Sequence, residues 1–363
     1  MKITSIFSYN PTVLLFSARL VSILCSTGTV IMAIKTNKKL FSGKNNWIFI
    51  ILVSLLPQFV FISSYVNTDS LAIFSTTLII YSWLLGLEHD WRMKDCLFLG
   101  ISLSICALSY YNAYGFILCS MFVFPISQLI AKTGSKKYSI IFKKCCFVSA
   151  VVILLCGWWF LRNYLIYDGD ILGLKTSNHY SEMYAIDQYK PSQIQTPLHN
   201  NISLFCMLFK IGWLNVTYMS FIGIFGYMNI LIYPWMYYIY SLIFIIGIIG
   251  CLCYFKKIFF FKKSDSLSKK KSLFNIVMFI SAIIPNILNI IYSYTCDFEP
   301  QGRYSLPMLI PFMYFISTGI NNILNKLIKN TKLFKVTRYT ICLVCILISI
   351  LCFTNIIVPK YCN

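Results

Sequence analysis

The chain has 363 residues, of which 58% are hydrophobic and only 12% are charged, with 31 Lys and Arg against 11 Asp and Glu. A soluble domain carries roughly 25% charged residues, so this composition excludes an ordinary soluble enzyme, a disordered chain and a nucleic-acid-binding domain. In a soluble protein the formal charge of +20 would suggest nucleic acid, but here the basic residues lie between apolar segments. The composition predicts an all-α polytopic integral membrane protein.

A helix that crosses a bilayer needs about 20 mostly apolar residues, and the chain offers about ten such segments. In chain order they are residues 12–34, 46–64, 69–87, 96–110, 113–131, 144–162, 233–255, 273–293, 305–324 and 337–358. They form a single transmembrane domain over 1–363. The long connection at 163–232 is predicted to hold interfacial or re-entrant helices, because its apolar stretches are aromatic and interrupted.

Most of the basic residues lie in alternate connections between these segments, at 35–44, 92–94, 132–144, 256–271 and 326–338. Connections rich in Lys and Arg face the cytoplasm, so ten spans place the N-terminus and the C-terminus outside. Reading 96–131 as one span would put two neighbouring basic connections on opposite sides of the membrane. The short pair of spans is therefore retained.

Acidic residues show the opposite distribution. Those assigned to the outer side are Asp69, Asp168, Asp170, Glu182, Asp187, Asp297 and Glu299. Acidic residues contribute little to topology, so their position has another cause. Decoration of solvated loops is one interpretation, and a functional site on the outer face is the other.

Four clusters on the outer side are candidates for such a site, and each also has a structural interpretation. They are 65–70 with Asn67 and Asp69, 157–170 with Arg162, Asn163 and Asp168, 220–227, and 297–307 with Glu299, Gln301, Arg303 and Tyr304. Asp69 would cap the third span, the tryptophans of 157–170 suit an interface belt, and 220–227 suits a re-entrant turn. For 297–307 function is favoured, because dense polar groups at membrane depth are costly unless they are used.

The order of these clusters resembles the GT-C superfamily of membrane glycosyltransferases, and most closely a set of bacterial membrane proteins of that type. The matching pieces are 18–22 (ARLVS), 56–59 (LPQF) followed by 67–69 (NTD), 158–164 (WWFLRNY) and 301–304 (QGRY). They extend from about residue 18 to residue 312, which is most of the chain.

The resemblance implies transfer of a sugar from a polyprenyl-phosphate carrier to a glycan or lipid acceptor of the cell envelope, on the outer face of the bacterial cytoplasmic membrane. Asp69 stands where the superfamily has its second acidic motif, which makes it the catalytic candidate. The substrate-binding candidates are Asn67, Arg162, Asn163, Asp168, Glu299, Gln301, Arg303 and Tyr304, with the two arginines placed to hold the carrier's phosphate. A divalent cation between Asp69 and that phosphate and a metal-free site are equally consistent with the sequence. Membrane lipids are the remaining expected partners, and nucleic acid is not expected.

One part of the superfamily pattern has no counterpart, because residues 1–11 contain no carboxylate that would match the first acidic motif. The first helix and the first outer loop would then be missing. A truncated gene product, a start site further upstream and a protein that keeps the fold without transferring sugar all explain this. The alternative functions are a polysaccharide or lipid transporter, flippase or polymerase-like protein, and a non-catalytic scaffold of envelope assembly. Spans nearly free of carboxylates favour surface chemistry over translocation.

Overall fold

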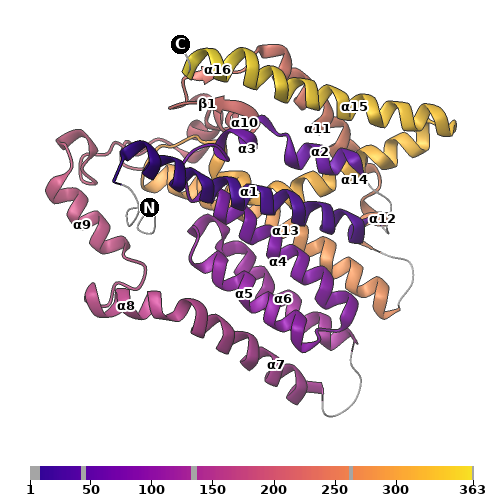
Figure 1. Ribbon diagram of the computed structural model, residues 1–363, viewed down its shortest axis with the longest axis horizontal. Helices are drawn as coiled ribbons and strands as arrows, with labels where there is room; N and C mark the ends of the chain where they lie inside the picture. Colours follow the sequence, from indigo (N-terminus) through magenta and orange to yellow (C-terminus); the bar gives the residue numbers. More distant parts are fainter. Residues whose placement is uncertain (1–8, 42–45, 132–136, 261–264, 362–363) are drawn as a thin grey trace.

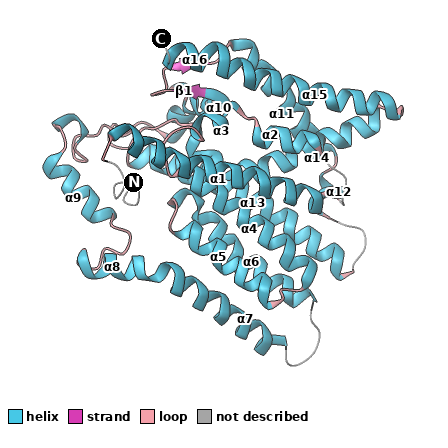
Figure 2. Cartoon of the chain, in the orientation of Figure 1, coloured by secondary structure: helices cyan, strands magenta, loops and turns pink. Residues whose placement is uncertain are grey.

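The computed structural model describes residues 9–41, 46–131, 137–260 and 265–361. Both termini (1–8 and 362–363), expected outside, and parts of three basic connections (42–45, 132–136 and 261–264) lie outside the described residues. The described chain is mostly helical, with one antiparallel pair of two-residue strands (Figure 2). The prediction of an all-α polytopic protein is confirmed.

The first part of the chain forms six helices and one 3₁₀ turn. These are α1 (Pro11–Leu40), α2 (Trp47–Ser54), α3 (Pro57–Ile62), α4 (Asp69–His89), α5 (Met93–Ala107), η2 (Tyr111–Ala113) and α6 (Tyr114–Ala131). Local chemistry sets several of their ends. The side chain of Asn10 accepts a hydrogen bond from the backbone N–H of Thr12, and Pro11 stands in the first turn, where its missing N–H costs nothing. Helix α4 ends at Asp90, which adopts the left-handed conformation.

The middle of the chain is less regular. It forms α7 (Lys137–Val152), η3 (Ile153–Gly157), α8 (Trp158–Ile166), α9 (Leu174–Tyr184), η4 (Asp187–Tyr189), η5 (Cys206–Lys210), α10 (Trp213–Gly223), β1 (Ile224–Phe225) and β2 (Ile230–Leu231). Helix α9 has no buried residue, whereas α10 buries Trp213 and Phe221. The interfacial location proposed for the connection at 163–232 stays a prediction.

The last part of the chain returns to long helices. It comprises α11 (Pro234–Cys253), α12 (Phe255–Phe259), α13 (Ser266–Thr295), η6 (Gly302–Met308), α14 (Leu309–Leu327), α15 (Thr331–Leu351), η7 (Cys352–Ile357) and α16 (Val358–Tyr361). Glycines let two of these helices approach closely, because a Cβ atom on Gly319 would lie 1.9 Å from the carbonyl oxygen of Gly247. Small residues at helix contacts are typical of membrane proteins.

Within the described chain, eight helical segments are long and apolar enough to cross a membrane. They are Pro11–Leu40, Asp69–His89, Tyr111–Ala131, Lys137–Ile166, Pro234–Cys253, Ser266–Thr295, Gly302–Leu327 and Thr331–Tyr361. Each corresponds to one of the about ten predicted spans. The two predicted spans without such a segment, 46–64 and 96–110, are helical but shorter.

These two regions lack a helix of spanning length for different reasons. The first is divided into α2 and α3 at Pro57, which has no N–H to continue a helix, and the preceding Leu56 is extended. The second is α5, whose 15 residues rise about 22 Å. That length falls short of the hydrocarbon core of about 30 Å.

The helices pack as neighbouring pairs around a common core (Figure 1). Helix α1 packs on α4, α4 on α5, α5 on α7, and α6 on α13, while α11 packs on α14 and α2 on α15. Helices α7 and α15 lie at opposite edges of the molecule, and α4, α5, α6 and α13 lie between them (Figure 1). The large side chains of Trp83 and Phe116 fill the space between α4 and α6.

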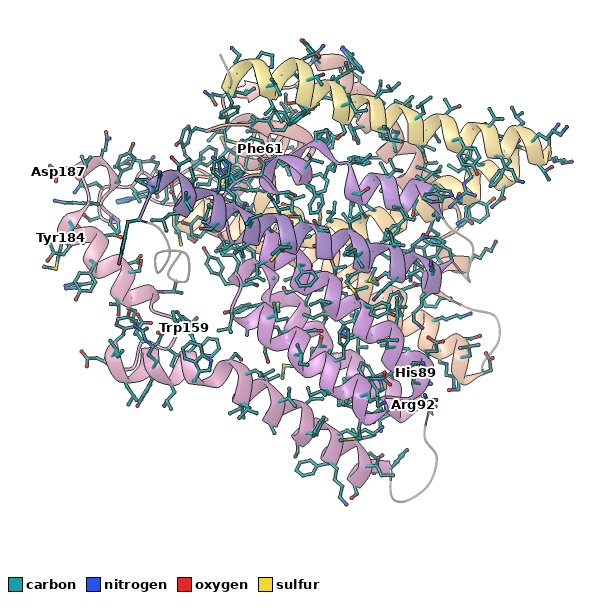
Figure 3. All side chains as sticks on the ribbon, viewed as in Figure 1. Phe61, His89, Arg92, Trp159, Tyr184 and Asp187 are labelled. Carbon is teal, nitrogen blue, oxygen red and sulfur yellow. The ribbon has the colours of Figure 1, made fainter. Side chains whose placement is uncertain are left out.

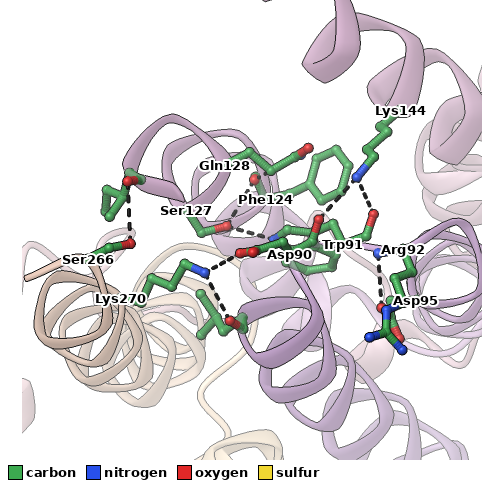
Figure 4. Close-up of polar contacts among 12 residues, drawn as sticks. Asp90, Trp91, Arg92, Asp95, Phe124, Ser127, Gln128, Lys144, Ser266 and Lys270 are labelled. Atoms are coloured by element: carbon green, nitrogen blue, oxygen red, sulfur yellow. Dashed lines mark hydrogen bonds and ion pairs between the residues drawn. The ribbon is translucent and has the colours of Figure 1, made fainter. Parts of the chain in front are cut away.

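Basic side chains from separate connections meet at the turn between α4 and α5. The ring of Trp91 is buried there, and its Nε1 donates to Oγ of Ser127 at 2.7 Å. Lys144 donates to the carbonyl oxygens of Asp90 and Trp91, and Lys270 pairs with the carboxylate of Asp90 (Figure 4). Two of the basic connections and the α4–α5 turn therefore lie at one end of the bundle.

The residues assigned to the outer side gather at the other end. Helix α4 has 21 residues and is about 30 Å long, so Asp69 at its start is separated by that length from His89 at its end. In Figure 3, His89 and Arg92 lie at one end of α4 and α5, while Phe61 on α3 lies away from them. The charge pattern of the sequence thus corresponds to two chemically different ends of one bundle.

Candidate functional site

Asp69 is the first residue of α4 and is 7% exposed. Its position depends on Asn67, whose amide donates to the carbonyl oxygens of Ile62 and Tyr65 and whose Oδ1 accepts from the backbone N–H of Ser70 at 2.9 Å. All the polar atoms of Asn67 are therefore used to hold the turn. Asn67 positions the start of α4.

The carboxylate of Asp69 has no direct partner among the described side chains: no hydrogen bond or ion pair within 4.0 Å engages it. A buried carboxylate without a partner is costly. The start of α4 stabilises negative charge through its dipole, and Arg303 is the cation that acts on Asp69 electrostatically. The carboxylate is therefore free to accept a proton or hydrogen bond from a ligand.

Arg303 lies in the 3₁₀ turn η6, which leads into α14. Its Nη2 donates to the hydroxyl of Tyr304 at 2.8 Å, and that hydroxyl donates to Oε2 of Glu299. The buried Nε of Arg303 has no partner among the described residues. Glu299 and Tyr304 hold one side of the guanidinium and leave its Nε donor available.

The turn that carries Arg303 lies directly against α10. A Cβ atom on Gly302 would lie 2.1 Å from the backbone nitrogen of Phe221 and 2.5 Å from the carbonyl oxygen of Thr217. Only glycine permits this approach of the two backbones. Asn289 supports the turn from α13 by donating to the carbonyl oxygen of Gln301 at 3.3 Å.

A cavity of about 150 Å³ lies beside Arg303. Its lining comes from α3, the α3–α4 turn, the segment at 220–228 and η6, and includes Gln58, Phe61, Tyr65, Ser220, Met228, Gln301 and Arg303. Gln58 fixes the strand pair on one side, because its Oε1 accepts from the backbone N–H of Ile224 at 3.0 Å. Segments that are distant in sequence thus form one polar pocket at the end of the bundle.

Tyr65 links the Asp69 region to this cavity. Burial raises the pKa of the Tyr65 hydroxyl, and the negative charge of Asp69 raises it further. The neighbouring Arg303 guanidinium acts in the opposite direction. Tyr65 is therefore a neutral hydrogen-bonding group between the carboxylate and the arginine.

A second cavity, of about 590 Å³, lies on the same side of the protein. It is lined by amide and carboxylate side chains, among them Asp187, Gln188, Gln193, Gln195 and Asp297. The backbone N–H of Leu198 donates to the carbonyl oxygen of Tyr294 at 3.2 Å, which ties the long connection to the end of α13. Burial and the nearby Glu299 raise the pKa of Asp297.

The cluster at 157–170 forms a separate surface on α8. The guanidinium of Arg162 lies over the rings of Trp159 and Tyr167, at 5.2 and 5.8 Å, and its Nη1 donates to Oδ1 of Asn163 at 3.1 Å. Asp168 is exposed in a left-handed turn after α8. Helix α8 continues from α7 along one edge of the molecule (Figure 1). Arg162 and Asp168 are exposed, whereas Asn163 is buried and also donates to the carbonyl oxygen of Ile171 at 3.1 Å. The structure does not bring these three residues against Asp69.

Several residues near the pocket are not identified as site candidates by the sequence. Tyr110 stacks on Tyr304 with ring centroids 6.1 Å apart, and Asn112 donates to the carbonyl oxygen of Tyr304 at 3.4 Å. Gln58 and Met228 line the cavity. The sequence offers a turn at 110–114 and a flexible stretch at 220–227, but the packing that joins them to η6 is long-range.

No group of three or more His, Cys, Asp or Glu side chains with metal-binding geometry occurs in the described parts of the chain. The open acceptors and donors near the cavity are one carboxylate, one guanidinium, amides and hydroxyls. This donor set suits an anionic or polyhydroxylated ligand.

The model of a protein family described as "Predicted membrane protein (DUF2142)" matches residues 1–312. The match includes α1 to η6 and therefore both Asp69 and Arg303. No curated protein matches the chain.

Proposed function

This chain belongs to the DUF2142 family of predicted membrane proteins, and from that premise we propose that it is a GT-C-like glycosyltransferase. It moves a sugar from a polyprenyl-phosphate carrier to a glycan or lipid acceptor of the cell envelope, on the outer face of a bacterial cytoplasmic membrane. The outer face is the end of the bundle that holds Asp69, because the Lys-rich connections at the other end face the cytoplasm.

One observation carries the proposal: Arg303 lines a polar cavity and has an unused donor, and it acts electrostatically on Asp69, a buried carboxylate without a direct partner. Asp69 is 7% exposed, and Nε of Arg303 is buried without a partner among the described residues. Buried polar groups in proteins are nearly always paired. Two adjacent exceptions of opposite charge indicate a site that a ligand completes.

The chemistry follows from these two charges. Asp69 accepts the proton of the acceptor hydroxyl, whose oxygen forms a bond to the anomeric carbon of the sugar. The bond from that carbon to the carrier's phosphate oxygen breaks, and the carrier leaves as a phosphate monoester. Arg303 stabilises the negative charge that develops on the departing phosphate.

The neighbouring groups orient the reactants. Glu299 and Tyr304 fix the guanidinium of Arg303 through their hydrogen bonds, and Gln301 lines the cavity. The larger cavity at Asp297, lined by carboxylate and amide groups, is where the acceptor glycan lies. Arg162, which Asn163 holds through its amide oxygen, and Asp168 after α8 bind the carrier away from the reacting centre.

Asp69→Asn and Arg303→Gln test the proposal. Loss of a general base lowers rates by typically 10²–10⁴-fold, and loss of one charge-stabilising donor by about 10²–10³-fold. The measurement is release of polyprenyl phosphate from a radiolabelled polyprenyl-phosphate hexose, in membranes that contain the full chain and a cell-envelope extract as acceptor.

Glu182→Gln is the matched control, because Glu182 is an exposed carboxylate of the long connection and glutamine keeps an oxygen for its bonds to Ser192. It should retain the parent rate. Parent-like release by both site variants at equal protein levels would contradict the proposal. Movement of the intact lipid-linked hexose across sealed vesicles, without release of the sugar, would instead identify a transporter or flippase.

A further inference from the structure

A cavity of about 610 Å³ lies at the basic end of the bundle, far from the proposed catalytic pocket. It is formed where α1 and α4 end and α13 begins, with α14 beside them. Four lysines line it: Lys38, Lys39, Lys270 and Lys271. The two pairs are far apart in the sequence and come together only in the fold.

Two of these lysines are neutralised by carboxylates of α4 and its C-terminal turn. Lys39 pairs with Glu88. Lys270 pairs with Asp90 and donates to the carbonyl oxygen of Leu87 at 3.2 Å (Figure 4). Lys270 is 8% exposed, so its pair fixes α13 against α4. These contacts build the base of the cavity.

The other two lysines have no carboxylate partner in the part of the chain that the structure describes. Lys38 is the residue before Lys39 in the last turn of α1, and Lys271 follows Lys270 in the first turns of α13. Both are exposed. The cavity therefore holds two uncompensated positive charges, which an anion can neutralise.

The rest of the lining is largely apolar. Leu84 and Leu87 of α4 and Phe274 of α13 form walls toward the bundle. The polar groups at the inner side are satisfied, since the hydroxyl of Tyr314 donates to Oδ1 of Asn275 at 2.9 Å. A ligand for this cavity thus needs a negatively charged head and an apolar body.

We propose that this cavity binds one acidic phospholipid of the cytoplasmic leaflet. Its phosphate lies between Lys38 and Lys271, and its acyl chains follow Leu84, Leu87 and Phe274 into the bilayer. The location agrees with the charge pattern, because basic pockets between transmembrane helices on the cytoplasmic side bind anionic headgroups. The lipid joins α1 to α13 and stabilises the end of the bundle opposite the catalytic pocket.

The test uses the full chain purified in a neutral detergent and three probes: phosphatidylglycerol, phosphatidylcholine and glycerol 3-phosphate. Phosphatidylglycerol should raise the thermal unfolding temperature and remain bound in native mass spectra. Phosphatidylcholine and glycerol 3-phosphate should do neither, because one has no net charge and the other has no acyl chains.

Lys38→Gln with Lys271→Gln removes the two uncompensated charges. Each lysine near anionic lipid contributes roughly fivefold in affinity, so loss of both should weaken phosphatidylglycerol binding by roughly 30-fold. Lys329→Gln with Lys332→Gln is the matched control, because these exposed lysines, one in the α14–α15 connection and one in the first turn of α15, do not line the cavity. Lys38→Arg with Lys271→Arg should keep the binding.

Equal loss of binding in both glutamine pairs would overturn the proposal, because attraction would then depend only on net charge. An equal rise in unfolding temperature with glycerol 3-phosphate would overturn the lipid assignment and indicate a site for soluble phosphate esters. Retention of phosphatidylglycerol by the chain with Lys38→Gln and Lys271→Gln would show that the lipid lies elsewhere.

Discussion

At the scale of single residues, the position of Arg303 depends on the glycine before it. Gly302 lies so close to α10 that a Cβ atom would overlap the backbone of Phe221. Backbone atoms of a packed helix cannot rotate away as a side chain would. The turn η6, and with it the guanidinium, would have to move outward.

Gly302→Ala is therefore expected to destabilise the protein by roughly 1–3 kcal/mol, the usual cost of overpacking, and to abolish sugar transfer. The loss of stability comes from overlap with the backbone of α10, and the loss of transfer comes from displacement of Arg303 relative to Asp69. Thermal unfolding and the release assay measure them. Gly157→Ala is the control, because the nearest atoms to its added Cβ, at 3.3 Å, belong to the Ile153 side chain. Normal transfer by Gly302→Ala would show that the position of η6 does not matter.

Single residues also show what the sequence could predict about the pocket. Asp69 and Arg303 stand out in sequence because charged residues beside apolar spans are rare and costly. In the structure the charge of Arg303 acts on Asp69, and the role of the two residues in a site stays a prediction. Tyr110 and Asn112 carry no such signal, since tyrosine and asparagine are ordinary turn residues and their contacts with Tyr304 cross almost 200 positions of the chain.

At the scale of elements, hydrophobic length predicted the long helices well and the interrupted ones less well. Predicted segments of 19 to 23 residues correspond to α1, α4, α11 and α13. The segment at 46–64 is equally apolar, but Pro57 divides it. Hydropathy measures the free energy of transfer to lipid and is not affected by the missing N–H of a proline. Only the proline itself indicates that the helix is interrupted there.

The sequence also could not predict which helices pack against each other. Helices α11 and α14 touch through Gly247, Gly250 and Gly319, and a Cβ atom on Gly250 would lie 2.2 Å from the carbonyl oxygen of Gly319. Glycines on a helix indicate a close contact. A single sequence does not say which helix is the partner.

Gly319→Ala should separate α11 from α14, because the new Cβ would meet the carbonyl oxygen of Gly247 at 1.9 Å. We expect a loss of roughly 1–3 kcal/mol in the free energy of unfolding, measured by thermal unfolding in detergent. Gly28→Ala serves for comparison, since its Cβ would meet only the ring of Phe74, which can shift. Equal unfolding temperatures for the two variants would argue against a rigid glycine contact.

At the scale of the whole molecule, the bundle has one end that is rich in lysine and one that holds the polar pocket. The sequence predicted this polarity because it depends on charge counts along the chain, which need no knowledge of packing. The pocket itself could not be predicted from the sequence, because α3, the segment at 220–228 and η6 come together only after folding. The proposed sugar transfer and the proposed lipid binding therefore belong to opposite ends of the bundle.

This polarity makes a prediction that concerns the entire chain. Tyr227 is fully exposed at the cavity beside Arg303, and Lys332 is exposed in the first turn of α15, in a basic connection. Tyr227→Cys should react with a membrane-impermeant thiol reagent added to intact cells, and Lys332→Cys should react only after the cells are opened. Each variant is compared with the unmodified chain, which sets the background from the native cysteines. Reaction of both introduced cysteines in intact cells would place the pocket and the lysines on the same side. The proposed separation of sugar transfer from acidic-lipid binding would then be wrong.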